Sequence, residues 1–394
     1  MDVTATKQAA VIGGDNEPPA AVLCARLREM ATTIAEERAS FDAAGRLPDD
    51  LFRKLAELDL FRLWLPSAFG GPELSALAFM DVVEEASALD GAVGWLVGNG
   101  GGMGRVAAFL SEESAREIFD DPHAFVVSGT AGVGRAVPSD GGFRVSGRWP
   151  FGSGSPHATW FTPFCEIEKD GERTGRIINP VVPRANVILH DNWHVSGLCG
   201  TGSGDFELQD VFVPDHFVHP QQPEPTLPGT LYRLPTGSIY PWTVATVPIG
   251  LARGALREFL AIAGQRKRRN DALPLAEREL VQSEIGRIDA RLSASRAYMR
   301  QAMTDLLAAV EAESDLVPAR VRLRMACTFA SEGALWAIGL LTEIAGAISI
   351  FKTCPLERYE RDARAAAKHI AMSPTAYVTG GKLVLGQDLS MMRF

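Results

Sequence analysis

The feature that most constrains the fold is that the hydrophobic period of the chain changes twice. From Pro18 to about Phe119, apolar residues recur at spacings of three and four, the period of an amphipathic helix. Between about His123 and Leu234 the pattern changes to short β-rich runs separated by turn residues. From about Pro241 the helical period returns. A chain of this kind is expected to fold as helical and β layers rather than as one sheet or one bundle.

The helical parts divide into segments with clear boundaries. In the N-terminal part we predict helices over 21–37, 51–58 and 75–89, and one more that begins after 111–113. In the C-terminal part we predict helices over 244–266, 276–310, 318–350 and 355–370. Long antiparallel amphipathic helices of this kind favour a four-helix bundle.

The middle part contains several short strands without intervening helices, which favours an antiparallel barrel or sandwich. A proline-rich stretch over 220–229 is typical of an extended linker. The predicted fold class is therefore mainly α with a β middle domain (α+β). We expect a disordered tail at 1–16, an N-terminal helical domain at 17–122, a middle β-barrel domain at 123–235 and a C-terminal four-helix bundle at 236–394.

The composition excludes several classes of protein. The chain has 39 Lys and Arg against 48 Asp and Glu, a formal net charge of −9, which argues against coating nucleic acid or an anionic membrane. No uninterrupted apolar run reaches about 18 residues, so no membrane span is predicted, and the N-terminus has no secretory signal pattern. The five cysteines are scattered and form no CxxC pair, which indicates a reducing cytoplasm.

Three glycine-rich segments are candidates for cofactor binding: GNGGGMG at 98–104, GTAGVG at 129–134 and GTGSG at 200–204. None is a Walker loop, and none has the strand-to-helix context of a dinucleotide-binding fingerprint. They are either turns and sites of close backbone packing, or backbone N–H groups that line a flat or anionic cofactor. HExxH and GxSxG motifs are absent, so we predict neither a metal site nor a hydrolase.

His369 and an aromatic pair are the remaining candidates for chemistry. His369 lies near the end of the helix predicted over 356–369, where the macrodipole favours the imidazolium cation; it could equally be a helix cap. Trp149 and Phe151 are expected on one face of an extended chain, two residues apart. They are either core aromatics beside a turn or a flat apolar wall suited to an isoalloxazine ring.

Five motifs, spread from Phe61 to Asp362, together resemble one known group of proteins. They are FRLWLPSAFGGP (61–72), VSGRWPFGSG (145–154), WHVSGLCGTGSGD (193–205), VFVPD (211–215) and PLERYERD (355–362). With the order of domains, they are similar to the acyl-CoA dehydrogenase fold superfamily. The resemblance implies an N-terminal helical domain, a middle β-barrel, a C-terminal four-helix bundle, flavin bound between barrel and bundle, and a homotetramer.

The chain resembles one branch of that superfamily more closely than the other. Many acyl-CoA dehydrogenases carry a catalytic Glu a few residues after the Arg-Asp pair of the last bundle helix, whereas this chain has none over 361–371 and reaches His369 instead. The strand ending GRWPFGSG, the GTGS loop and the histidine after the RDARA helix resemble the oxygenase components of two-component flavin-dependent monooxygenases.

The resemblance implies a flavin-dependent monooxygenase. A separate flavin reductase would supply FADH2 or FMNH2, and O2 would add to the flavin C4a to give a hydroperoxide that hydroxylates a phenolic or other aromatic substrate. Acyl-thioester desaturation, oxygenation at nitrogen or sulfur, and a flavin-binding protein without turnover are the alternatives.

The resemblance also assigns roles to individual residues. His369 would hydrogen-bond the hydroperoxide or deprotonate a phenol, and Ser153, or alternatively Ser155, would hydrogen-bond the flavin near N5. Trp149 and Phe151 would wall the ring. The remaining predicted cofactor-binding positions are near the flavin or the substrate entrance: Thr130, in the segment that replaces the usual Thr-Glu-Pro motif, and Thr201 and Ser203 of the GTGSG loop.

Overall fold

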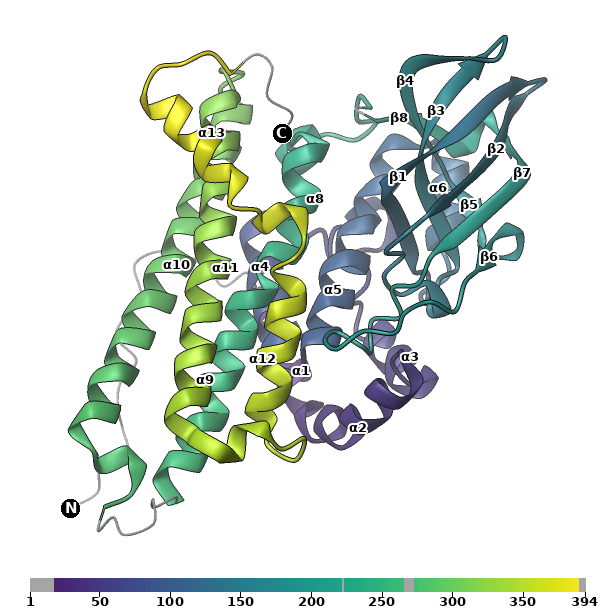
Figure 1. Ribbon diagram of the computed structural model, residues 1–394. Coiled ribbons are helices and arrows are strands. Elements are labelled where there is room, and N and C mark those ends of the chain that lie inside the picture. The colour runs from purple at the N-terminus through teal and green to yellow at the C-terminus, as the bar shows by residue number, and fades with distance from the viewer. Residues whose placement is uncertain (1–17, 222, 266–272, 390–394) are drawn as a thin grey trace.

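The computed structural model describes residues 18–221, 223–265 and 273–389. The long C-terminal helices stand side by side in one layer, the β-sheet lies on the opposite side of the molecule, and helix α5 lies between them (Figure 1). The predicted order of helices, strands and helices is therefore confirmed. The tail predicted at 1–16 lies outside the described residues.

Among the described residues, six α-helices precede the sheet. Their bounds are α1 (Pro18–Glu29), α2 (Ala31–Ala44), α3 (Asp49–Glu57), α4 (Ala76–Leu89), α5 (Gly91–Met103) and α6 (Glu112–Phe119). The single helix predicted over 21–37 is wrong, because the chain tightens into a turn at Met30 and begins a second helix. Helices α3, α4 and α6 agree with the prediction to within two residues at their N-terminal ends.

Helix α5 is a glycine-rich, buried helix at the centre of the molecule. Asp90 caps its N-terminus by accepting hydrogen bonds from the N–H groups of Ala92 (2.9 Å) and Val93 (3.3 Å). A side chain at Gly98 would run into the Thr243 carbonyl, and one at Gly100 into the Phe125 ring. The close-packing interpretation of the 98–104 segment is therefore confirmed, whereas the turn interpretation is wrong.

The middle of the chain forms one sheet with the strand order β6-β7-β2-β1-β3-β4-β8, in which β5 also pairs with β3. The strands are β1 (Val126–Ser139), β2 (Gly142–Trp149), β3 (Trp160–Lys169), β4 (Glu172–Pro180), β5 (Val182–Pro183), β6 (Ile188–Leu189), β7 (Phe206–Pro214) and β8 (Val218–Pro220). The segment GTAGVG belongs to β1, where the register shifts between Gly129 and Gly134.

The prediction of a purely antiparallel barrel is wrong, because the central pair β1 and β3 is parallel. Strand β2 folds back antiparallel to β1 through a tight turn at Gly141, whose φ is +71°. The segment between β2 and β3 then returns the chain to the start of β1, where the Thr159 N–H donates to the Phe125 carbonyl (3.0 Å). The result is a mixed sheet with β6 and β8 at its ends.

Seven helices follow the sheet in the described residues: α7 (Thr230–Arg233), α8 (Thr236–Ala245), α9 (Val247–Gln265), α10 (Glu279–Glu311), α11 (Val317–Ala345), α12 (Pro355–Ala366) and α13 (Thr375–Val384). Helix α11 packs against α9, α10 and α12 (Figure 1). Helix α10, predicted over 276–310, buries one apolar face that includes Ile288 and Met299. Helix α12 ends at Ala366, so the prediction that His369 is helical is wrong.

By length and composition alone, the segment Val317–Ile350 passes as a membrane-spanning helix. In this fold it is α11 and the turn that follows it, and it packs on three neighbouring helices.

Candidate functional site

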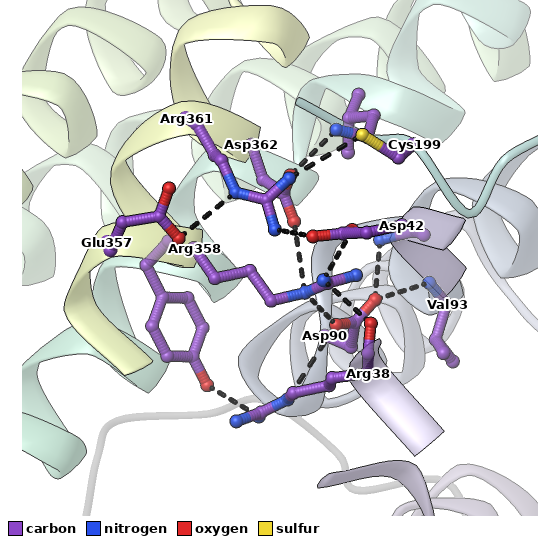
Figure 2. A network of polar contacts seen from close by, with 12 residues as sticks. Arg38, Asp42, Asp90, Val93, Cys199, Glu357, Arg358, Arg361 and Asp362 are labelled. Carbon is purple, nitrogen blue, oxygen red and sulfur yellow. Dashed lines mark hydrogen bonds and ion pairs between the residues drawn. The ribbon is translucent and has the colours of Figure 1, made fainter. Parts of the chain in front are cut away.

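A largely buried network of polar contacts joins α12 to α2, to the start of α5 and to the loop that precedes β7 (Figure 2). Arg358 of α12 donates from Nε to Asp90 at the start of α5 (2.7 Å) and pairs with Asp42 of α2 (2.8 Å). Arg361, one turn further along α12, also pairs with Asp42 (2.5 Å). These contacts fix α12 against α2 and α5, and so fix the position from which the chain continues to His369.

The same network holds the GTGSG loop. Asp362 is fully buried, and its Oδ1 accepts a hydrogen bond from the Leu198 N–H (2.7 Å). Leu198 has a φ of +55°, which is uncommon for a residue other than glycine. Burial and the nearby carboxylate of Asp90 raise the pKa of Asp362, while Arg358 opposes the increase. The conformation of the loop therefore depends on a carboxyl group of α12.

From Leu198 a chain of hydroxyl groups leads toward the helical layer. The Thr201 Oγ1 donates to the Leu198 carbonyl (2.8 Å) and lies 2.7 Å from the Ser203 Oγ, which lies 2.8 Å from the Ser153 Oγ. Thr201 and Ser203 are 1% and 4% exposed, so water cannot replace these partners. The structure thus brings three of the predicted site residues into one hydrogen-bonded chain.

Trp95 of α5 connects this chain to His369. Its indole Nε1 donates to the Ser153 Oγ (3.0 Å), and its ring contacts the imidazole of His369 edge to face at a centroid distance of 5.6 Å. Ser153 and His369, far apart in the sequence, therefore both contact the same buried indole. Trp95 is a site residue that the motifs did not reveal, since it lies in a glycine-rich segment.

His369 caps the short 3₁₀ turn Ile370–Met372, and its Nδ1 accepts a hydrogen bond from the Ala371 N–H (3.2 Å). Burial, with a smaller contribution from the Arg324 cation, lowers the pKa of His369 to about 4. The expectation that a helix C-terminus favours the cation is therefore wrong, because α12 ends before this residue. A neutral imidazole whose Nδ1 accepts must carry its proton on Nε2, so His369 presents an N–H donor.

The aromatic pair of the GRWPFGSG strand divides between two roles. Trp149 has no exposed surface, and its Nε1 donates to the Phe164 carbonyl (2.9 Å) inside the β domain. Phe151 is 64% exposed and has a φ of +61°. The expectation that both share one face of an extended chain is wrong, because β2 ends at Trp149 and the backbone turns. Only Phe151 offers a ring surface to a bound molecule.

Ser155 and Thr130 lie apart from the hydroxyl chain. Ser155 is 2% exposed and donates to the Gly152 carbonyl (2.6 Å), so its hydroxyl proton closes a local turn. Its assignment as a cofactor contact stays a prediction, in which its hydroxyl could only accept a hydrogen bond. Thr130 is exposed where the register of β1 shifts, and it remains a prediction.

A cavity of about 600 Å³ lies between the end of α2 and the GTGSG loop. Its lining includes Arg46, Ser155, Trp193 and Gly202, and the Trp193 ring meets Phe151 edge to face at 6.4 Å. The described part of the chain holds no cluster of three or more His, Cys, Asp or Glu side chains that could bind a metal ion.

Two family models match the chain. The model for the N-terminal domain of acyl-CoA dehydrogenases matches residues 23–120, and the model for the C-terminal domain matches residues 242–374. The chain belongs to the acyl-CoA dehydrogenase family. The middle sheet lies between the two matched regions, as the resemblance implied.

Named relatives place it in the oxygenase branch of that family. A pigment production hydroxylase of Rhodococcus erythropolis is 30% identical over 387 residues, covering 92% of this chain and 96% of the relative. The oxygenase subunit HsaA, a flavin-dependent monooxygenase of Rhodococcus jostii, is 29% identical and covers 90% and 96%. The structure of XiaF from a Streptomyces species, in complex with FADH2 and glycerol, superposes with a TM-score of 0.88 at 26% identity, covering 96% and 98%.

The family assignment confirms the predicted flavin cofactor and the predicted enzyme class. The individual site residues stay predictions, with their geometry now defined. Two residues of this family member were missed by sequence reasoning: Trp95, for which the sequence held no signal, and Asp362, whose Arg-Asp motif was noted only as a landmark.

Proposed function

We propose that this protein is the oxygenase component of a two-component monooxygenase that hydroxylates a phenolic or related aromatic compound. The observation that carries the proposal is the arrangement around Trp95, whose buried indole donates to the Ser153 hydroxyl and also contacts the His369 imidazole. The names of the relatives support the substrate class: they include an indole-3-acetate monooxygenase and a resorcinol hydroxylase dependent on FADH2.

The residues present fit a reduced flavin. Phe151 offers an exposed apolar ring just after β2, which suits the face of a flat tricyclic group. Ser153 has an oxygen lone pair left over after it accepts from Trp95. When bound, reduced flavin supplies the two electrons that activate O2 for transfer of one oxygen atom to the substrate. Thr130 is a further candidate for contact with the flavin, because it is exposed where the register of β1 shifts.

His369 acts in this proposal as a hydrogen-bond donor. Its neutral imidazole holds a proton at Nε2, because Nδ1 is occupied by the Ala371 N–H. In this orientation it can hold a reacting oxygen atom or a substrate phenol oxygen, whereas deprotonating a phenol would need the Nδ1 bond to break. Of the two roles considered for this residue, we therefore favour donation over proton abstraction.

We propose a homotetramer, because the resemblance to the family implies one. Of the most apolar stretch of Val317–Ile350, 39% is buried within the chain, which leaves side chains of α11 only partly covered for contact with other copies. We also propose that α9, α10, α11 and α12 form the four-helix bundle of the family, with the domain division at 122 and 235.

A separate flavin reductase is the expected partner, as the names of relatives as oxygenase subunits and components imply. The five cysteines are free and buried, in keeping with the cytoplasm that we propose as the location.

Desaturation of an acyl thioester is the rival reaction within the family. It would need a carboxylate base facing the substrate. The described buried carboxyl of α12, Asp362, instead faces the Leu198 N–H and Arg358. The geometry therefore favours oxygenation.

The deciding experiment supplies the purified chain with reduced FAD or FMN, O2 labelled with ¹⁸O, and a panel of phenols. We expect one labelled oxygen atom in the product. Replacing His369 by Asn or Ser153 by Ala should lower the product formed per flavin oxidised. Bleaching of a flavin-loaded protein by an acyl-CoA without oxygen would support the rival, and so would the absence of any labelled product.

A further inference from the structure

The hydroxyl chain at the site has a fixed direction, which follows from one bond at its far end. The Thr201 Oγ1 lies 2.8 Å from the Leu198 carbonyl oxygen. A carbonyl has no proton, so the proton in this bond must come from Thr201. A hydroxyl has one proton only. Either oxygen could donate in the 2.7 Å contact between Thr201 and Ser203, and with the Thr201 proton directed at Leu198 we orient this contact so that Thr201 accepts.

The direction then passes along the chain. With the Thr201 proton donated to the Leu198 carbonyl, Ser203 donates to Thr201. With the Ser203 proton donated to Thr201, Ser153 donates to Ser203 across 2.8 Å. The backbone at Leu198, where this row of hydroxyl groups ends, is fixed in turn, since the Leu198 N–H donates to the buried Asp362 at 2.7 Å.

Ser153 is left as an acceptor only. Its proton is directed to Ser203, and one of its two lone pairs accepts from the Trp95 Nε1 at 3.0 Å. One lone pair remains for a bound molecule. Thr201 is 1% exposed, Ser203 4% and Leu198 4%, so no solvent molecule is available to reverse the direction.

We propose that Thr201 and Ser203 select the redox state of the flavin, because they hold the Ser153 hydroxyl oxygen as a hydrogen-bond acceptor. In this orientation Ser153 accepts from the N5–H of reduced flavin. Against oxidised flavin, a lone pair of the Ser153 oxygen would face the lone pair of N5. The inference rests on the proposed function, in which Ser153 faces N5. Reduced flavin carries a proton on N5, whereas oxidised flavin has an acceptor nitrogen there. An acceptor placed against an acceptor leaves both without a partner and so discriminates against that ligand.

The test is a binding measurement rather than an activity. Dissociation constants for oxidised and for reduced FAD and FMN are measured with the full chain under anaerobic conditions, for the wild type and for Ser203→Ala. Without the Ser203 oxygen, the Ser153 proton is free to turn to N5. We expect oxidised flavin to bind about 3- to 10-fold more tightly, the worth of one hydrogen bond, with little change for reduced flavin.

Two further variants separate this explanation from general damage. Thr201→Val removes the anchor of the chain and should also tighten oxidised flavin. Ser153→Ala should reduce discrimination by weakening reduced flavin instead. Ser295→Ala is the matched control, because Ser295 is equally buried in α10 and its hydroxyl has no hydrogen-bond partner in the described part of the chain; the ratio of the two dissociation constants should not change.

The outcomes are distinguishable. If the wild type hydroxylates a phenol but Ser203→Ala and Thr201→Val leave the ratio of dissociation constants unchanged, or weaken both redox states alike, the selection by hydroxyl direction is refuted while the proposed function stands. If the wild type binds neither redox state of FAD or FMN, both fail together.

Discussion

Replacing Trp95 by phenylalanine tests whether the indole couples the two halves of the site. The substitution removes the hydrogen bond from Nε1 to the Ser153 Oγ, which is 3.0 Å long, and part of a ring that is only 8% exposed. A hydrogen bond of this kind contributes about 0.5–1.5 kcal/mol. The lost ring atoms add about 2 kcal/mol at roughly 0.8 kcal/mol for each buried carbon. We therefore expect the free energy of unfolding to fall by about 2–4 kcal/mol.

The functional effect should be separate from the loss of stability. Without the indole N–H, the Ser153 hydroxyl has one partner fewer and can rotate, and the smaller ring packs less closely on His369. The hydrogen bond alone corresponds to roughly a 2- to 13-fold change, since 1.36 kcal/mol is tenfold. The product formed per reduced flavin oxidised should fall by that factor, with the rest of the flavin reoxidised to give H2O2. Urea unfolding measures the stability, and product yield against peroxide measures the coupling.

Trp64 provides a matched control for this experiment. It is fully buried beside Phe79 in the N-terminal helical part, and its indole N–H has no hydrogen-bond partner in the described residues. Trp64→Phe therefore removes the same atoms without breaking a hydrogen bond, and should lower stability but leave the coupling unchanged. The reasoning is refuted if Trp95→Phe keeps the wild-type coupling, or if Trp64→Phe lowers the coupling equally.

Three further predictions concern the frame of the site. Arg358→Met should lower the free energy of unfolding by about 3–5 kcal/mol, since it leaves Asp90 buried without its 2.7 Å partner; a loss below 1 kcal/mol in urea unfolding would contradict this. Gly100→Ala should cost about 1–3 kcal/mol by forcing a methyl group against Phe125, whereas Gly286→Ala, with open space around it, should stabilise α10 by up to about 1 kcal/mol. Burial lowers the pKa of His219 and His369 to about 4 each in the folded protein. As the pH drops from about 6.5 to 4, these histidines are therefore protonated in the unfolded chain before they are in the folded one, and the free energy of unfolding should fall. Urea unfolding midpoints that stay level across this range would refute the assignment.

The order of the layers was predictable because it depends on hydrophobic period alone. The strand arrangement was not, because pairing depends on contacts between distant segments. The pairing of β1 with β3 is an example: it arises when the 150–159 segment returns the chain beside Phe125, and no local pattern signals that return. Helix α5 escaped prediction for a related reason. Its glycines oppose helix formation locally, and close packing against Phe125 and Thr243 overrides that preference.

The site residues show the same limit at the scale of side chains. Ser153 and Ser203 were predicted because their motifs resemble those of a known branch of the family, and the structure places them 2.8 Å apart. Trp149 was misplaced because alternation along a strand assumes that the strand continues, and β2 ends at that residue. The protonation of His369 was mispredicted because a helix end was expected beside it, when α12 ends three residues earlier and burial governs the imidazole instead.

Helix α12 accounts for how two distant motifs can form one site. Asp362 holds the loop that carries Thr201 and Ser203, and the same helix delivers the chain to His369 seven residues later. Any movement of α12 along its axis would therefore shift the acceptor side and the donor side of the site together. The ion pairs of Arg358 and Arg361 with Asp42 oppose such a movement. We therefore expect these ion pairs, although costly to desolvate, to fix the position of Ser153 relative to His369 more strictly than a packed apolar contact between helices would.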